Sequence, residues 1–153
     1  MTGLQLKVPP DLVWIVAATL MWLASRWAPG IAVETPIRIA LAGLLVGGGV
    51  ALIVAARVAL NRAQTTWHPS RPDRATQLVT GGPFRYSRNP TYLGMLLVLL
   101  GWAVLLASPL ALVPAGLFVA YLNRFQIRPE ERALSALFGH EYDVYAGRVR
   151  RWL

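Results

Sequence analysis

The sequence predicts an all-α integral membrane protein, and three observations support this fold class. The 153-residue chain is 56% hydrophobic, only 14% of its residues are charged, and its mean hydropathy is +0.48. A soluble domain carries about 25% charged residues, so much of this surface is expected to face lipid. Long uncharged runs alternate with short arginine-rich segments. The length then predicts a single membrane-embedded domain, residues 1–153, with about four transmembrane helices.

Composition also excludes several classes of protein. The chain has no cysteine, which rules out a disulfide scaffold, a thiolate zinc site, an iron–sulfur cluster and a cysteine nucleophile. His68 and His140 have no partners at metal-ligand spacing, so no metal site is expected. The net charge is +8, but the arginines lie at the ends of apolar runs. We therefore expect membrane lipids, and not nucleic acid, as the partners of this charge.

The first two predicted spans are Leu12–Ser25 and Ile39–Ala56, which contain 14 and 18 uncharged residues. The first is short against the roughly 17–25 residues that a span requires. Arg26 and Trp27 follow it and suit the membrane interface, so it is still expected to cross. The second contains Gly43 and the run Gly47–Gly49, which we expect to allow a neighbouring helix to approach closely.

The third and fourth spans are predicted to form a helical hairpin. Asn89–Asn123 is a run of 35 residues without a charge, which is about 50 Å of helix against a hydrocarbon core of about 30 Å. Ser108–Pro109 breaks this run near its middle. The expected arms are Thr91–Ala107 and Pro109–Phe125, with a kink in the return arm at Pro114.

Arginine placement predicts the orientation. The connection 61–89 carries five arginines against one acid, and the tail from Arg124 onward carries six. The positive-inside rule therefore puts both termini and this connection in the cytoplasm of a multi-pass protein, which fits a bacterial inner membrane. The tail after Pro129 has an apolar face of Leu134, Leu137 and Phe138, continued by two tyrosines. It predicts a C-terminal amphipathic helix on the cytosolic membrane face.

Two polar patches flank the hairpin, at Gly81–Tyr92 and Arg124–Glu131. A tight hairpin returns its two ends to the same side, so these patches are expected to meet in one pocket. The pair Glu130 and Glu131 has two explanations. The acids favour the helix dipole after Pro129 or form salt bridges, or one of them binds the amine or hydroxyl groups of a polar cofactor. The arginines Arg85 and Arg88 are similarly open between membrane anchoring and function.

Four segments in this order resemble a known family: LVTGGPFRYSRNPTYLG (Leu78–Gly94), the pair Glu130-Glu131, FGHEYDVY (Phe138–Tyr145) and a closing VRRW. Together they resemble the isoprenylcysteine carboxyl methyltransferases and the related phospholipid N-methyltransferases. The resemblance implies a cofactor-binding methyltransferase core over residues 76–152. It further implies a membrane-embedded enzyme that transfers a methyl group from S-adenosyl-L-methionine to a lipophilic acceptor.

The resemblance also implies roles for individual residues. The implied cofactor contacts are Thr76, Gln77, Leu78, Val79, Phe84, Asn89, Pro90, Thr91, Tyr92 and Glu130. The expected catalytic residues are Arg88, Asn89, Tyr92 and Glu131, and the expected substrate contacts are Arg124 and Arg128. Asn89 stands where many members have histidine, and asparagine cannot act as a titrating base. The family's substrate arginine aligns nearest to Gln126.

Several alternatives stay open from the sequence. The acceptor is an isoprenylcysteine-like carboxylate, a lipid amine or a hydrophobic thiol, and we expect it to come sideways from the bilayer between the hairpin and the second span. A membrane NADPH-dependent enzyme of the sterol-reductase type and a non-enzymatic helical membrane scaffold are the competing functions. The sequence leaves the oligomeric state and any general base undefined.

Overall fold

The computed structural model describes residues 8–27, 30–65 and 75–153, and this part of the chain is helical with no strand. The all-α prediction is confirmed for it. The residues His68, Arg71, Asp73 and Arg74, which entered the predictions above, lie outside the described residues.

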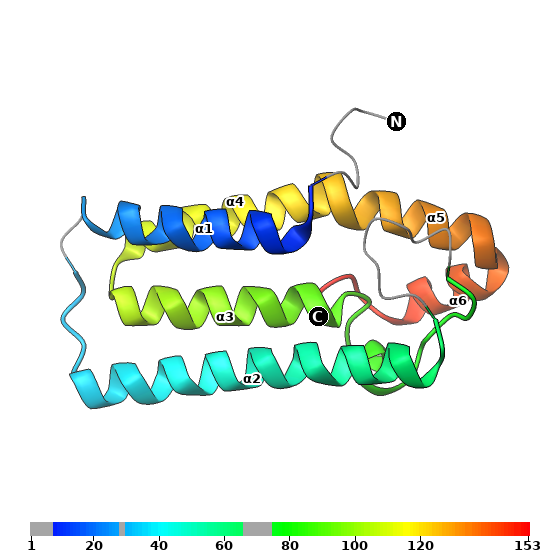
Figure 1. Ribbon diagram of the computed structural model, residues 1–153, viewed down its shortest axis with the longest axis horizontal. Coiled ribbons are helices and arrows are strands. Elements are labelled where there is room, and N and C mark those ends of the chain that lie inside the picture. Colours follow the sequence, from blue (N-terminus) through cyan, green and yellow to red (C-terminus); the bar gives the residue numbers. More distant parts are fainter. Residues whose placement is uncertain (1–7, 28–29, 66–74) are drawn as a thin grey trace.

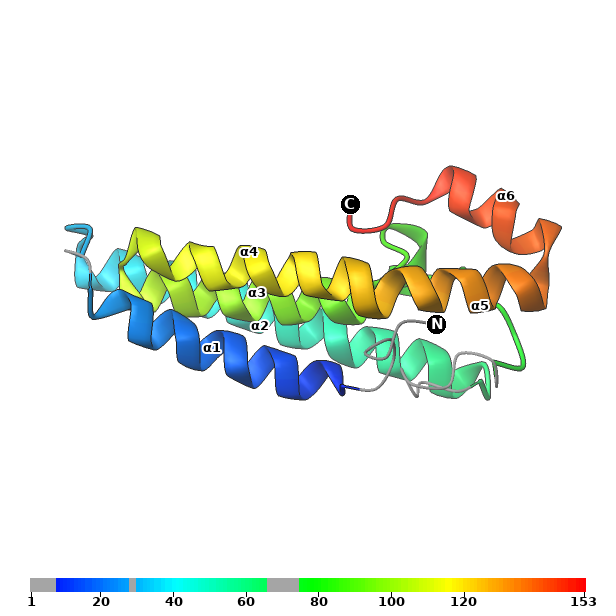
Figure 2. The same ribbon diagram turned by 90° about the horizontal axis from the view of Figure 1, so that it is seen from above.

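Four apolar helices form an antiparallel bundle, and the chain then continues beyond its end. The elements are α1 (Pro10–Ser25), α2 (Thr35–Arg62), the 3₁₀ turn η2 (Gly82–Arg85), α3 (Pro90–Leu106), the 3₁₀ turn η3 (Pro109–Ala111), α4 (Leu112–Tyr121), the π-helical segment η4 (Leu122–Ile127), α5 (Arg128–Phe138) and α6 (His140–Arg148). Figure 1 shows α3 between α2 on one side and α1 with α4 on the other. In Figure 2, α5 extends the line of α4, and α6 turns back beside it.

Two described helices are long and apolar enough to cross a membrane. They are Thr35–Arg62, with 28 residues, and the continuous helix Pro109–Phe138, with 30. The helices α1 and α3 are apolar but shorter, with 16 and 17 residues. Large apolar side chains are exposed on the outer faces of the bundle, among them Leu44 and Leu117. The membrane character is therefore clear, while the four-span topology and its orientation stay predictions.

The helices α2 and α3 approach each other closely through glycine. A Cβ atom on Gly49 would lie 2.6 Å from the carbonyl oxygen of Gly94, and a Cβ atom on Gly94 would lie 2.6 Å from that of Gly49. A side chain at either position therefore cannot fit without moving backbone. The predicted role of the glycines in helix approach is confirmed at Gly49. It is wrong for Gly43, Gly47 and Gly48, where a Cβ would meet nothing within 4 Å.

The predicted hairpin break is confirmed. The helix α3 ends at Leu106, Ala107 takes a left-handed conformation with φ of +50°, and Ser108 is extended. Pro109 then starts η3. The residue before a proline avoids the α-helical region for steric reasons, so Ser108 cannot continue α3, and the chain reverses here.

The return arm contains a π-helical segment just before Pro129, while the predicted kink at Pro114 stays a prediction. Pro114 is the third residue of α4, in the first turn, where backbone N–H groups have few helical acceptors. Pro129 lies inside the long helix and has no N–H for the carbonyl of Phe125. The preceding turn, η4, widens into a π-helix, which accommodates the missing bond.

The tail also differs from its prediction as one amphipathic helix. It divides at Gly139, whose φ of +51° suits glycine. The first part, α5, continues the hairpin's return arm, and the second part, α6, packs back against it. A location of this tail on the membrane face stays a prediction.

Candidate active site

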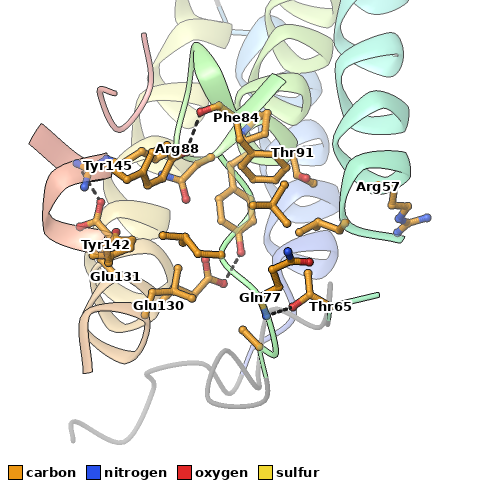
Figure 3. Close-up of a pocket in the computed structure, with 18 of the residues that line it drawn as sticks. Arg57, Thr65, Gln77, Phe84, Arg88, Thr91, Glu130, Glu131, Tyr142 and Tyr145 are labelled. Carbon is orange, nitrogen blue, oxygen red and sulfur yellow. Dashed lines mark hydrogen bonds and ion pairs between the residues drawn. The ribbon is translucent and has the colours of Figure 1, made fainter. Parts of the chain in front are cut away.

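A cavity of about 220 Å³ lies at the end of the bundle where α1 begins, α2 ends and the hairpin starts and returns (Figure 3). Eleven of the predicted site residues line it: Gln77, Leu78, Val79, Phe84, Arg88, Asn89, Pro90, Thr91, Tyr92, Glu130 and Glu131. The expectation that the two polar patches meet in one pocket is confirmed by this lining.

Glu130 and Tyr92 join the two arms of the hairpin. The hydroxyl of Tyr92, in the first turn of α3, donates a hydrogen bond of 2.7 Å to Oε1 of Glu130, in the first turn of α5. The side-chain amide of Gln126 donates a second hydrogen bond of 2.7 Å to the same oxygen. Two neutral donors thus fix one carboxylate oxygen and leave the lone pairs of Oε2 as acceptors for a ligand.

Glu131 is held differently, by two guanidinium groups. Arg151 donates from Nε to Oε1 at 3.0 Å and from Nη2 to Oε2 at 2.6 Å. Arg88 adds an ion pair of 3.3 Å to Oε1. Of the two explanations for the paired acids, the salt bridge therefore applies to Glu131, and Glu130 is the carboxylate bonded by neutral donors.

Asn89 occupies the N-cap position of α3, but its side chain makes no cap hydrogen bond. Its Nδ2 instead donates to the carbonyl oxygen of Arg151 at 3.0 Å. Its own N–H donates to Oγ of the buried Ser87 at 3.1 Å. The orientation of the Asn89 amide is thus set by the segment that follows α6.

The turn η2 forms the aromatic wall of the cavity. Gly82 has a φ of +59°, and Pro83 follows it in the 3₁₀ turn. The hydroxyl of Tyr145 donates to the carbonyl oxygen of Phe84 at 2.8 Å, which ties α6 to this turn. Burial raises the pKa of Tyr145 to about 12, so its hydroxyl is a protonated donor at neutral pH. Burial likewise raises the pKa of Tyr142, whose ring packs edge-on to that of Tyr145 with centroids 6.3 Å apart.

Three predicted site residues do not line the cavity. Thr76 is exposed, and its N–H donates to Oγ1 of Thr65 at 3.1 Å while its hydroxyl donates to the carbonyl of Gln64 at 3.2 Å. These bonds tie the start of the segment 77–79 to the residues that follow α2. Arg124 and Arg128 are exposed on the return arm outside the lining.

Sequence reasoning missed the contribution of the first two helices and α6. The additional lining residues are Pro10, Asp11, Arg57, Leu60, Thr65, Ala75, Met95, Leu134, Tyr142 and Tyr145. A signal for two of them was present, because Asp11 and Arg57 are the charges that bound the first two apolar runs. Antiparallel helices bring the start of the first and the end of the second to the same side.

A second, apolar recess of about 190 Å³ lies nearer the middle of the bundle, between α1 and α2 over α3. Trp14, Val46, Val98 and Trp102 are among its lining residues. The indole N–H of Trp14 donates to the carbonyl of Met95 at 3.0 Å, and Met95 itself lines the larger cavity. The two hollows are therefore neighbours along α3.

The larger cavity combines a carboxylate, aromatic rings and an apolar wall. This set suits a ligand that carries a positive charge beside an apolar or aromatic part. Within the described ranges, no group of three or more acidic, histidine or cysteine side chains is placed to hold a metal ion.

Comparison with known proteins identifies the class and then the family. A family model described as "Phospholipid methyltransferase" matches residues 37–141, which include α2, both arms of the hairpin, Tyr92 and Glu130. The class is that of membrane methyltransferases. The chain belongs to the phospholipid methyltransferase family, in which its relatives include proteins named as isoprenylcysteine methyltransferases.

Individual relatives match parts of the chain. A protein of Haemophilus influenzae named only "Uncharacterized protein" is 45% identical over 62 residues, which are 40% of this chain and 98% of that protein. A "Probable protein-S-isoprenylcysteine O-methyltransferase" of Oryza sativa subsp. indica is 36% identical over 77 residues, 50% of this chain and 40% of the relative. The "Protein-S-isoprenylcysteine O-methyltransferase" of Saccharomyces cerevisiae is 39% identical over 75 residues, 47% of this chain and 30% of the relative. The chain thus spans two fifths or less of the length of these two named methyltransferases. No solved structure matches it.

Proposed function

We propose that this protein is an integral membrane methyltransferase that takes a methyl group from S-adenosyl-L-methionine and transfers it to a lipophilic acceptor. The observation that carries the proposal is the 2.7 Å hydrogen bond between Tyr92 and Glu130. It joins the two segments in which the resemblance is strongest as walls of one cavity. The core of this activity is residues 76–152.

The residues of the cavity fit this cofactor. Its sulfonium group is cationic, and its amino and hydroxyl groups donate hydrogen bonds, for which Glu130 offers an acceptor oxygen that its two neutral donors do not occupy. Phe84 and Tyr92 offer aromatic faces, and the segment 77–79 offers backbone groups beside apolar side chains. A cation is attracted to both a carboxylate and an aromatic face. When bound, the cofactor supplies an electrophilic methyl group for in-line displacement, which requires no metal and no covalent enzyme intermediate.

The protein then contributes binding, orientation and exclusion of water. Glu130 and Tyr92 hold the cofactor's polar part, while Asn89, Pro90 and Thr91 form the adjoining wall at the start of α3. Arg88 and Glu131 form an ion pair and complete the lining of the cavity next to these residues. Positioning of two reactants in a dry site is a large part of the acceleration available to such a displacement.

The acceptor is proposed to reach the cavity from the bilayer, while the cofactor comes from the cytosol. The close contact at Gly49 and Gly94 disfavours the access route between α2 and the hairpin that the sequence suggested. The apolar recess beside Trp14 and Trp102 supports a route between α1 and α2.

A carboxylate or thiolate acceptor needs no general base, whereas an ammonium must first lose a proton, which Asn89 cannot take up. Arg124 and Arg128 stay predicted contacts of an acceptor headgroup.

The first experiment measures S-adenosylhomocysteine binding by calorimetry in purified protein. We expect Glu130→Ala to weaken binding at least tenfold, equivalent to about 1.4 kcal/mol. The matched control is Glu141→Ala, which removes an exposed glutamate on α6 outside the cavity. Unchanged affinity in a folded Glu130→Ala variant would remove Glu130 from the cofactor site.

A second experiment separates the competing functions. Ligand binding to the folded state raises its melting temperature. A shift with S-adenosylhomocysteine and none with NADPH supports the methyltransferase, and the reverse supports the reductase. Incubation of membranes with methyl-labelled cofactor, followed by extraction of the labelled product, then identifies the acceptor class. Retention of cellular function by both Glu130→Gln and Tyr92→Phe would favour the scaffold.

A further inference from the structure

We propose that the segment Arg150–Trp152 positions the cavity wall, and that Arg151 is its positioning residue. This inference rests on the proposed function for its effect on cofactor binding, but its structural part stands on the contacts alone. None of the three residues lines the cavity. The segment acts through Asn89, Arg88 and Glu131, which do line it.

The backbone of this segment holds the residues that lead into α3. The carbonyl oxygen of Arg151 accepts hydrogen bonds from Nδ2 of Asn89 at 3.0 Å and from Oγ of Ser87 at 3.4 Å. The carbonyl oxygen of Arg150 accepts the main-chain N–H of Arg88 at 2.9 Å. Three consecutive residues, 87–89, are therefore bonded to two consecutive carbonyl groups more than 60 positions away in the chain.

The side chain of Arg151 holds the same segment to α5. Its guanidinium bonds both oxygens of Glu131, at 3.0 and 2.6 Å. Bidentate pairs of this kind fix geometry as well as charge. The Glu131 side chain is 17% exposed, so loss of Arg151 would leave a largely buried carboxylate with Arg88 as its remaining cation.

A third contact connects the segment to the π-helical turn. The indole N–H of Trp152 donates to Oδ1 of Asn123 in η4 at 3.1 Å. The segment thus touches the start of α3, the first turn of α5 and η4. These are the elements that carry Tyr92, Glu130 and Gln126. Since the Asn89 amide does not cap its own helix, the carbonyl of Arg151 is the contact that sets its direction.

The test uses the full chain and begins without ligand. In Arg151→Gln we expect hydrogen exchange at the main-chain N–H of Arg88 to become at least tenfold faster, while exchange in the middle of α3 stays unchanged. The affinity for S-adenosylhomocysteine is expected to fall at least tenfold without a matching fall in melting temperature. Arg151→Lys, which keeps the charge but not the bidentate geometry, should give intermediate values of both quantities.

Arg148→Gln is the matched control, because it removes the same charge from an exposed position at the end of α6. It should match the wild type in exchange and affinity. Wild-type exchange and affinity in Arg151→Gln would overturn the inference. So would losses that accompany a global fall in stability and appear equally throughout α3. If Arg151→Gln does not fold, Arg151→Lys decides by the same two readouts. If the wild type itself fails to bind S-adenosylhomocysteine, the proposed function fails, and the exchange measurement still tests the positioning role.

Discussion

At the scale of single residues, the least expected member of the site is Gln126. It is 2% exposed, and its amide bonds the carboxylate of Glu130 at 2.7 Å. The family resemblance also implies that it stands nearest to the position of a substrate-binding arginine. A neutral donor at this position orients a carboxylate without cancelling its charge, whereas a guanidinium would pair with it. Gln126 is therefore suited to prepare Glu130 for a cationic ligand.

We predict that Gln126→Leu weakens S-adenosylhomocysteine binding about tenfold. The variant removes the hydrogen bond of the Gln126 amide to the Glu130 carboxylate, worth about 1.5 kcal/mol net, and keeps the side chain close to its original size. Calorimetry is the measurement. Tyr92→Phe should have a similar effect, because Tyr92 bonds the same oxygen. Wild-type affinity in both variants would mean that orientation of Oε1 does not matter for binding.

Tyr145 gives a prediction about pH. Burial raises its pKa from 10 to about 12, so folding favours the neutral hydroxyl that donates to Phe84. For a group whose pKa is raised in the folded state, the stabilisation is complete below the unfolded pKa and is lost as pH rises through the folded pKa. The melting-temperature advantage of the wild type over Tyr145→Phe should thus stay constant up to about pH 9 and shrink between pH 10 and 12. An advantage that persists unchanged at pH 12 would contradict this assignment.

At the scale of elements, the contact of α2 with α3 depends on single glycines. We predict that Gly49→Ala destabilises the protein by about 1–3 kcal/mol, as overpacking typically does, because the new methyl group would lie 2.6 Å from the backbone oxygen of Gly94. Gly48→Ala is the control on the same helix, where a Cβ meets nothing within 4 Å. Thermal unfolding in detergent distinguishes them. Equal melting temperatures for the two variants would count against a tight glycine contact.

The sequence predicted some elements better than others for physical reasons. A charge-free run about twice as long as needed to cross a bilayer requires a reversal, so Ser108–Pro109 was identifiable. A proline followed by acidic residues is typical of a helix start, but whether Pro129 begins a helix or interrupts one depends on packing of the turn before it. Gln126 is buried and bonded to Glu130 of α5, which local sequence does not encode.

The same distinction holds for the site. Tyr92 and Glu130 were predictable because they lie in motif segments that a hairpin returns to one place. Arg151 lies in the closing VRRW segment, but its contacts with residues 87–89 were not predictable, because they are made by main-chain carbonyl groups to residues more than 60 positions away. Thr76 was assigned to the surface of the site, but it is not among the residues that line the cavity and instead bonds Thr65 and Gln64.

At the scale of the whole molecule, the cavity, η2 and α6 gather at one end of the bundle, and the turns after α1 and α3 lie at the other (Figure 1). The arginine distribution predicts that the cavity end faces the cytoplasm. The chain has no cysteine, so a single introduced cysteine is the only thiol that can react with a label. We predict that Glu141→Cys reacts with a membrane-impermeant maleimide only when the reagent has access to the cytoplasmic side of the membrane. Val33→Cys should react only when the reagent is added to the opposite side. Labelling of both positions from one face would contradict the four-span topology.

The unbroken path from α4 through η4 into α5 has a mechanical consequence. One rod of 30 residues, Pro109–Phe138, runs from the hairpin tip to the wall that holds Glu130, with no loop to act as a joint. Under the proposed membrane placement, a change in bilayer thickness tilts this helix as a unit. The tilt would change the distance between Glu130 on this helix and Tyr92 on α3. Turnover in vesicles should accordingly peak at one acyl-chain length and fall off on both sides, with Gly49→Ala shifting that optimum.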